Sequence, residues 1–461
     1  MNLRSDKRPN IQGRLDFSSV APGEAREPGG KGIESLPAVH EPESPAGTDR
    51  MMEAICEWEN LKEAMRRVKT NQGSAGIDGM TVDELPDYAE LLVIREQLLS
   101  GTYAPQPVKR VEIPKPDGGV RKLGIPTVLD RFIQQAVLQV LQQRWDPTFS
   151  PHSYGFRPKR SAHQAVSAAQ SFIAEGCRWV VDLDLEKFFD RVNHDILMGR
   201  IAKRVNDPRL LRLLRAFLNA GVMEDGLVSP TEEGTPQGGP FSPLLSNIVL
   251  DDLDRELTRR GLRFARYADD CNIYVRSRRA GERVMASVTC YLTTRLKLQV
   301  NEAKSAVARP WERKFLGFSF TNGKTPKRRI APKALDRFKA KVRELTRRTR
   351  GISLEQMVKI LSRSLQGWRG YFAYCETPSV LKALDSWVHR RLRAFVWKQW
   401  RRGNRKFAEL RKRNVSRDLA AQTAGSCHGP WRLSKSPALH SAFPSAFFTS
   451  IGVPPLTPKP A

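Results

Sequence analysis

The residues best suited to chemistry are two adjacent carboxylates, Asp269 and Asp270, within Phe264–Val275. Apolar-rich, strand-like arms lie on either side of them, which predicts a β-hairpin with both carboxylates at its tip. Neighbouring like charges repel each other, and hard divalent cations such as Mg²⁺ take oxygen ligands. The pattern therefore indicates a metal site, and its plainer alternative is a solvated acidic turn.

A second acidic stretch, Arg178–Asp190, supports the metal interpretation. It begins with strand-like alternation that puts Asp182 and Asp184 on one face and Leu183 and Leu185 on the other. Carboxylates from one strand and a neighbouring hairpin can bridge two metal ions about 4 Å apart, a pair that promotes in-line phosphoryl displacement. Asp184 is thus the candidate third ligand, and exposure on a polar strand face is the alternative.

Several other elements must position these carboxylates. Residues 108–126 alternate and contain Asp117-Gly118-Gly119, which predicts a basic hairpin. Amphipathic patterns predict helices over 130–143, 162–175, 193–218 and 379–400. A glycine-rich loop, Gly234–Gly239, precedes a further expected helix. Residues 1–48 are rich in Pro, Gly, Glu and Ser, a composition typical of disorder.

The charge of the chain points to a polyanionic partner. Its 461 residues carry a net charge of +28, which favours nucleic acid over the alternative of an acidic membrane surface. Residues 324–417 hold 28 Lys and Arg against 6 Asp and Glu. No apolar run approaches the roughly 20 residues of a membrane span. No hydrophobic signal core and no Cys-x-x-Cys pair is present, so a cytoplasmic protein without disulfides is expected.

The motifs together resemble the reverse transcriptase/maturase proteins encoded within group II introns. The resemblance rests on Asp184-x-x-x-Phe188-Phe189-Asp190, then Gly234–Gly239, then Tyr267–Asp270, and covers about residues 71–417. It implies an α+β fold, a right-hand polymerase with fingers, palm and an α-helical thumb. The expected parts are a disordered tail (1–50), an N-terminal extension (51–105), fingers and palm (106–320), a helical thumb or maturase domain (325–410) and a small C-terminal tail that is a candidate for DNA binding (411–461).

The resemblance also implies a role for each site residue. Asp184 and Asp269 would bridge two Mg²⁺ ions, Asp270 would be a supporting ligand, and Leu185 would add its carbonyl. Lys304 would protonate the leaving pyrophosphate as a general acid. Phe189 would exclude a 2′-hydroxyl and so favour DNA synthesis. The other expected nucleotide-binding residues are Lys115, Arg121, Phe188, Gln237, Gly238 and Ala268.

The implied partners are group II intron RNA as template and ribozyme, a DNA target and primer, and dNTPs, with no membrane. RNA contacts are expected from aromatic and basic side chains, namely Arg157, Trp368, Arg369, Tyr371, Arg390, Arg391, Arg393 and Lys398. With Cys427-His428 as its only Cys/His cluster, the chain is expected to lack an endonuclease domain. By resemblance it is bacterial and associates with the nucleoid during intron mobility. Three alternatives stay open: a splicing-only maturase, a reverse transcriptase of a defence or diversity-generating system, and an RNA-dependent RNA polymerase.

Overall fold

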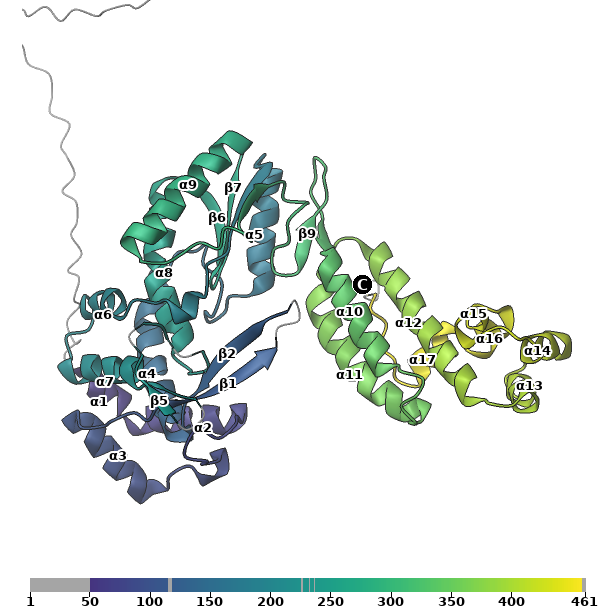
Figure 1. The fold of residues 1–461 in the computed structure, drawn as a ribbon, viewed down its shortest axis with the longest axis horizontal. Helices are drawn as coiled ribbons and strands as arrows, with labels where there is room; N and C mark the ends of the chain where they lie inside the picture. The colour runs from purple at the N-terminus through teal and green to yellow at the C-terminus, as the bar shows by residue number, and fades with distance from the viewer. Residues whose placement is uncertain (1–49, 115–117, 225–226, 232, 236, 458–461) are drawn as a thin grey trace, which may run out of the picture. The chain divides into compact units, whose positions relative to one another are not determined.

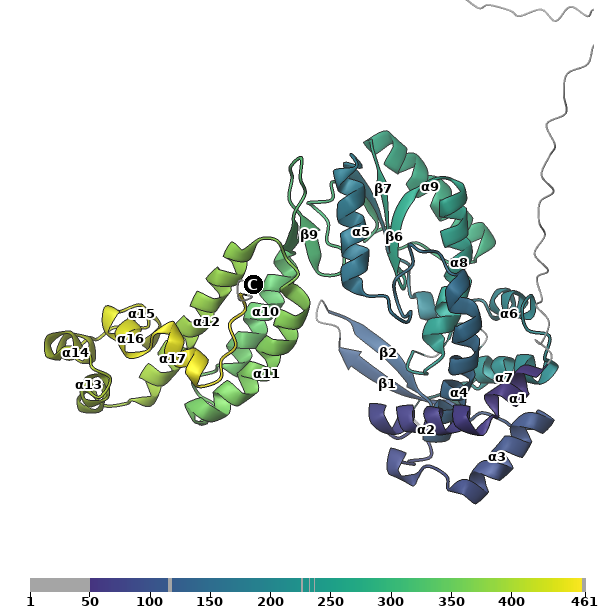
Figure 2. The ribbon, with the colours of Figure 1, turned by 180° about the vertical axis from the view of Figure 1, so that it is seen from behind.

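The computed structural model describes residues 50–114, 118–224, 227–231, 233–235 and 237–457. Lys115 and nearly all of the expected N-terminal tail lie outside the described residues. Helices mixed with antiparallel sheets give way to consecutive helices after residue 330, which confirms the α+β class with a helical C-terminal region (Figures 1 and 2). Among the described helices, none combines the length and the apolar character that a membrane span requires.

The N-terminal region is formed by three helices, of which the first two pack on the longer helix α4 and the third packs on the first and on α7 (Pro208–Asn219). These are α1 (Met51–Ile55), α2 (Trp58–Asn71) and α3 (Tyr88–Ser100), and α4 is Val128–Trp145. Cys56 and Glu57 separate α1 from α2. Buried apolar residues of all three helices share one hydrophobic cluster with α4, and such packing stabilises helices that are too short to be stable alone.

The predicted basic hairpin is confirmed. Strands β1 (Val108–Pro114) and β2 (Val120–Ile125) pair antiparallel, with Arg110 opposite Gly124 and Ile113 opposite Arg121. β1 also pairs in parallel with β4 (Val222–Glu224), which is followed by β5 (Leu227–Ser229). The resulting strand order, β2-β1-β4-β5, defines the basic sheet.

The carboxylate-bearing strands form a second sheet, the acidic sheet, with order β6-β7-β3-β8. Its strands are β3 (Trp179–Leu183), β6 (Arg263–Tyr267), β7 (Asp270–Val275) and β8 (Ala306–Ala308). Helices α5 (Ala162–Ala174) and α9 (Arg278–Arg295) pack on it, as Figure 1 shows. Helices α6 (His194–Ala202), α7 (Pro208–Asn219) and α8 (Ser242–Arg259) complete this part.

The C-terminal region has its own hydrophobic cluster, which runs from Ile330 to Leu456. The strands β9 (Phe318–Phe320) and β10 (Arg328–Ile330) lead into it. Its long helices are α10 (Pro332–Leu345), α11 (Leu354–Phe372) and α12 (Pro378–Gln399). They are followed by α13 (Gly403–Arg411), α14 (Arg417–Ala424), α15 (Pro430–Leu433), α16 (Pro437–Ala442) and α17 (Ser445–Ser450).

The expected C-terminal tail shares the core of the helical thumb. Phe443 and Phe448 are 1% and 0% exposed, and both belong to the cluster that also holds Leu392 and Phe395 of α12. Large aromatic side chains such as these contribute most when they are buried. The packing therefore joins residues 411–456 to the helices before them.

Candidate active site

The two adjacent carboxylates lie at the end of a tight hairpin, as predicted. β6 and β7 end at the pair Tyr267–Asp270, so Ala268 and Asp269 form a two-residue turn and Asp270 opens β7. Ala268 has φ +57°, in the left-handed region that residues with a Cβ seldom adopt. Such strain costs about 1–3 kcal/mol and persists only where the surroundings enforce it.

The register of the acidic sheet brings Asp184 to this turn. Leu183 of β3 is paired with Cys271 of β7. Asp184 comes directly after Leu183, and Asp270 comes directly before Cys271. Because the strands are antiparallel, Asp184 and Asp270 come opposite each other at the strand ends. The register therefore brings Asp184 next to the turn that carries Asp269 and Asp270, 85 positions further along the chain.

The convergence has an electrostatic signature. Burial, followed by the nearby charges of Asp182, Asp269 and Asp184, raises the pKa of Asp270 to about 8. Burial and the charge of Asp184 also raise the pKa of Asp269, while Arg121 opposes the rise. A bound cation would lower the free-energy cost of ionising neighbouring carboxylates. The chemistry of these carboxylates therefore suits divalent metal ions. Within the described residues, no three His, Cys, Asp or Glu side chains lie close enough together to hold a metal ion as they stand.

Asp184 is held by a loop that follows α9. Its backbone N–H donates to Ser305 Oγ at 3.0 Å, and its carbonyl accepts from the N–H of Asn301 at 2.8 Å. The same loop carries Lys304, whose Nζ lies 3.9 Å from Asp184 Oδ2. The loop thus fixes both the position of the carboxylate and the position of the predicted general acid.

A cavity of about 1000 Å³ opens beside the carboxylates. It is lined by most of the residues predicted for catalysis and nucleotide binding, namely Arg121, Asp184, Leu185, Phe188, Phe189, Gln237, Gly238, Asp269 and Lys304. Asp270 and Ala268 are not in the lining: Ala268 belongs to the turn, and Asp270 opens β7. Sequence reasoning missed Asn301 and Phe156, which also line the cavity. The only available signal for Asn301 was its closeness to Lys304 in the chain.

The adjacent aromatics Phe188 and Phe189 have different environments. Phe188 is 2% exposed and belongs to the main hydrophobic cluster, whereas Phe189 is only partly buried and packs against that cluster. Their rings meet edge to face at 5.2 Å. Phe188 therefore supports Phe189 from the core, and Phe189 is the ring with an accessible face in the cavity.

The glycine-rich loop contacts the basic sheet through its backbone. The N–H of Gly124 in β2 donates to the carbonyl of Gln237 at 2.9 Å. Gly238 has φ +146°, and a Cβ there would lie 2.5 Å from the carbonyl oxygen of Gly124. Glycine is required at this position because the two backbones approach so closely.

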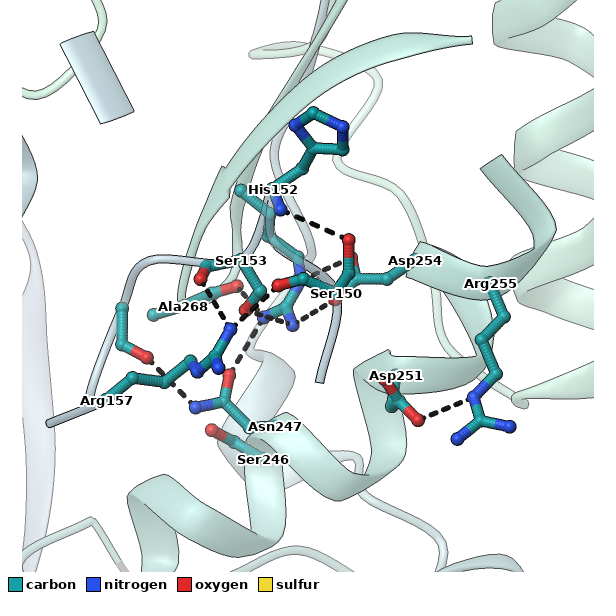
Figure 3. Close-up of polar contacts among 12 residues, drawn as sticks. Ser150, His152, Ser153, Arg157, Ser246, Asn247, Asp251, Asp254, Arg255 and Ala268 are labelled. Atoms are coloured by element: carbon teal, nitrogen blue, oxygen red, sulfur yellow. Dashed lines mark hydrogen bonds and ion pairs between the residues drawn. The ribbon is translucent and has the colours of Figure 1, made fainter. Parts of the chain in front are cut away.

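A buried polar network lies beneath the acidic turn (Figure 3). Arg266, fully buried, donates to both carboxylate oxygens of Asp254 in α8, at 2.7 and 2.5 Å. It also donates to the carbonyl of Ala268 at 2.9 Å and to Asn247 Oδ1 at 3.0 Å. The strained turn is thereby fastened to α8 by side chains that the sequence analysis did not single out.

The prediction that Arg157 contacts RNA is wrong. Its side chain is 5% exposed, and its Nε donates to Asp146 Oδ1 at 2.7 Å. The remaining donors bind the backbone carbonyls of Asp146, Ser150 and Ser153. Four of its five N–H donors are committed in this way and the side chain is buried, so Arg157 stabilises the loop that carries Gly155.

That loop explains how the turn is enclosed. A Cβ on Gly155 would lie 2.2 Å from the backbone nitrogen of Ala268, so glycine permits the loop to touch the turn. Asn247 Nδ2 in turn donates to the carbonyl of Gly155 at 2.9 Å. The acidic turn is therefore enclosed by helix α8 and by the loop before α5.

The other predicted RNA-contacting residues divide into two groups. Arg393 is 4% exposed and donates to the carbonyl of Phe443 at 3.0 Å, so its prediction is wrong because the helical core buries the side chain. Tyr371 donates its hydroxyl to Leu316 at 2.7 Å, and Trp368 packs on Phe338 with ring centroids 4.3 Å apart. Both aromatic side chains are partly buried and pack within the protein.

The second group stays accessible. Lys398 is exposed, and Arg369, Arg390 and Arg391 are partly buried. Arg390 lies over the ring of Trp431 at 3.7 Å from the centroid. These residues remain candidates for contact with RNA.

The chain is similar to known proteins in two adjacent regions. Residues 113–320 match the reverse transcriptase (RNA-dependent DNA polymerase) family, and residues 335–414 match the group II intron maturase-specific domain. Protein YkfC of Escherichia coli is 40% identical over 222 residues, which cover 46% of this chain and 58% of YkfC. The group II intron-encoded protein LtrA of Lactococcus lactis is 38% identical over 206 residues, which cover 44% of this chain and 34% of LtrA.

The chain thus spans little more than half of YkfC and about a third of LtrA. Among solved structures, the partial Cas6-RT-Cas1–Cas2 complex matches with 25% identity and a TM-score of 0.34, covering 53% of this chain and 42% of that chain.

Proposed function

Because the chain belongs to the family of group II intron reverse transcriptases and maturases, we infer that it is an RNA-directed DNA polymerase that also binds intron RNA. The observation that carries the polymerase proposal is the cavity beside the carboxylates, since most of the predicted nucleotide-binding residues line it. Its volume, about 1000 Å³, lies at the upper end of the roughly 300–1,000 Å³ of small-molecule sites.

The acidic residues would hold two Mg²⁺ ions. Asp184 and Asp269 would share the ions, with Asp270 as a supporting ligand and the carbonyl of Leu185 as a further oxygen donor. When bound, the ions would supply activation of a primer 3′-hydroxyl and charge stabilisation at the α-phosphate and leaving pyrophosphate. The raised pKa values of Asp269 and Asp270 support this proposal, because a cation would offset the burial and the weaker mutual repulsion that cause them.

The other residues of the cavity bind and orient the nucleotide. Arg121 would grip the triphosphate, since a guanidinium can bind phosphate oxygens in a bidentate manner. Lys304 would give a proton to the pyrophosphate as it leaves. Phe189 would meet the sugar, and a ring there would clash with a 2′-hydroxyl and exclude ribonucleotides.

Primer extension on an RNA template with Mg²⁺ and dNTPs tests this function. Asp184→Asn should lower the rate at least about 100-fold, because a metal site supplies several kcal/mol of transition-state stabilisation. Asp336→Asn, the same change at an exposed carboxylate of α10, is the matched control and should extend primers normally. An inactive wild-type protein that still promotes splicing would instead support the splicing-only alternative.

The maturase part of the proposal concerns partners. We propose that intron RNA serves as template and as ribozyme, and that a DNA target and primer bring the protein to the nucleoid during mobility. Sequencing RNAs that co-purify with the protein tests this. One dominant structured RNA would identify the intron, whereas a non-intron RNA would favour a reverse transcriptase of a defence or diversity-generating system.

A further inference from the structure

A second cavity, distant in sequence from the acidic residues, lies in the C-terminal region. It has a volume of about 350 Å³ and is lined by arginine and tryptophan side chains, which define the arginine–tryptophan pocket: Arg343, Arg348, Arg391, Trp387 and Trp431. Arg343 belongs to α10, Trp387 and Arg391 to α12, and Trp431 to α15. These three helices bring together residues that are up to 88 positions apart.

The charges of this pocket are not balanced from within. No carboxylate is among its lining residues in the described part of the chain. The nearest acidic residue in sequence, Glu344, forms its ion pair with Lys341 at 3.1 Å. Burial, and then the neighbouring charges of Arg348 and Arg343, lower the pKa of Arg391. The pocket therefore concentrates positive charge at a free-energy cost that a bound anion would offset.

One arginine of the pocket is held in place by the end of α10. Arg391 Nε donates to Thr346 Oγ1 at 2.8 Å, and its Nη2 donates to the carbonyls of Thr346 and Arg343 at 3.3 and 3.4 Å. The guanidinium is thus oriented before any ligand arrives. Preorganisation of this kind reduces the entropy lost on binding.

The tryptophans give the pocket a second recognition chemistry. Trp431 is 37% exposed, and Arg390 lies 3.7 Å from the centroid of its ring. The guanidinium groups of Arg343 and Arg391 lie 5.7 and 5.8 Å from the ring centroid of Trp387. Aromatic rings beside guanidinium groups can stack unpaired bases while the cations bind the adjoining phosphate.

We propose that the arginine–tryptophan pocket binds one unpaired nucleotide of an RNA, with the phosphate on the arginines and the base against a tryptophan. The proposal deepens the maturase function and rests on it. Proteins recognise RNA sequence mainly in single-stranded loops and bulges, whose bases are free to leave the stack. The volume of about 350 Å³ lies near the lower end of the roughly 300–1,000 Å³ of small-ligand pockets. A loop nucleotide therefore fits better than a duplex.

Binding of a fluorescent single-stranded RNA to the full chain, titrated with salt, tests the pocket. Arg348→Gln should weaken binding and reduce the slope of log K against log salt by about 0.7, the value for one lost phosphate contact to a single strand. Arg347→Gln is the matched control, because Arg347 is an equally exposed neighbour outside the lining. Equal effects of the two substitutions on affinity and slope would overturn the proposal.

Two further readouts report on the base. Trp431→Ala should weaken binding by about 5- to 150-fold, the range for loss of one stacked base, and Trp431→Phe should restore most of it. With RNA that contains 4-thiouridine, irradiation should cross-link peptides that include Trp431 or Trp387. Cross-links confined to other peptides would refute base stacking in the pocket. Base stacking would also be refuted if Trp431→Ala weakened the binding of an abasic RNA as much as the binding of normal RNA.

The failure of this proposal and the failure of the maturase function give different results. A wild-type chain that binds neither the single strand nor a structured intron RNA contradicts the maturase function itself. A wild-type chain that binds both, with no difference between Arg348→Gln and Arg347→Gln, contradicts only the pocket. If inorganic phosphate displaces the RNA only as much as its ionic strength explains, the result supports recognition of the whole nucleotide. Stronger displacement by phosphate indicates a site for free phosphate.

Discussion

Replacing Arg266 by methionine should show how the acidic turn is held. The substitution leaves Asp254 with its carboxyl fully buried and without the guanidinium that now binds both of its oxygens. Breaking a buried ion pair on one side costs about 3–5 kcal/mol. That is a large fraction of the 5–15 kcal/mol that typically separates folded from unfolded domains, as an order of magnitude.

A double substitution separates stability from positioning. Arg266→Met with Asp254→Leu removes both charges, and replacing a buried pair by apolar side chains of similar size is often nearly neutral. Urea unfolding should therefore show a lower midpoint for Arg266→Met and a recovery in the double variant. The double variant still lacks the hydrogen bond from Arg266 to the carbonyl of Ala268.

The activity of that double variant is the decisive measurement. A shift of the turn by about 1 Å can cost roughly 100-fold in rate, so primer extension should show a lower kcat despite restored stability. Two results would refute the reasoning: an unfolding penalty below about 1 kcal/mol for Arg266→Met, or a double variant that extends primers at the wild-type rate.

Four further predictions concern the cavity and its metal site. Phe189→Ala should reduce the preference for dNTPs over rNTPs by about 10- to 100-fold, measured as the ratio of kcat/KM values; an unchanged ratio would exclude the sugar clash. Lys304→Gln should lower kcat by about 10²–10⁴, as expected for loss of a general acid, and a change confined to KM for dNTP would contradict that role. Gly238→Ala should raise KM for dNTP and lower Tm, because strain of about 1–3 kcal/mol follows from its φ and the close approach of β2; Gly199→Ala, in an open helical position, is the control and should not lower Tm. Without metal, the pKa of Asp270 in the folded protein, about 8, lies above its value in the unfolded chain. The contribution of Asp270 to the free energy of unfolding should therefore be greatest below about pH 4. It should fall by up to about 1.4 kcal/mol per pH unit as the pH rises to 8. Mg²⁺ should therefore raise Tm more at pH 8 than at pH 6. If the Asp270→Asn variant shows the same difference between the two pH values, Asp270 is not the group responsible.

Local patterns were sufficient to predict the strands and turns that carry the carboxylates. Alternation in 179–185 placed Asp184 on the polar face, and the arms around Asp269 indicated a hairpin. These features depend on the period of two of a β-strand, which is visible in the sequence itself. The expected closeness of Asp184 to the hairpin came from the chemistry of a shared metal site and then from the family resemblance, and the strand register agrees with it.

The fate of the basic residues could not be predicted in this way. Arg157 and Arg393 have the composition of RNA-binding surface, yet their partners are Asp146 and the carbonyl of Phe443, 11 and 50 positions away. A local pattern does not record which distant acceptor a guanidinium will meet. The same holds for Arg266 and Asp254, whose pairing requires the packing of β6 against α8.

The positive φ of Ala268 has a consequence for protein engineering. A synthetic peptide covering 263–275 would lack Gly155, which touches the turn, and the α8 residues that bind Arg266. It would therefore lose the contacts that keep Ala268 at a positive φ. Grafting the acidic motif onto another scaffold should therefore fail unless α8 and the loop at 152–157 are transplanted with it. If the chain is cut between α8 and the hairpin, one fragment carries α8 and the loop at 152–157 and the other carries the carboxylates of the turn. Such a split chain should regain catalysis only when the two fragments reassociate.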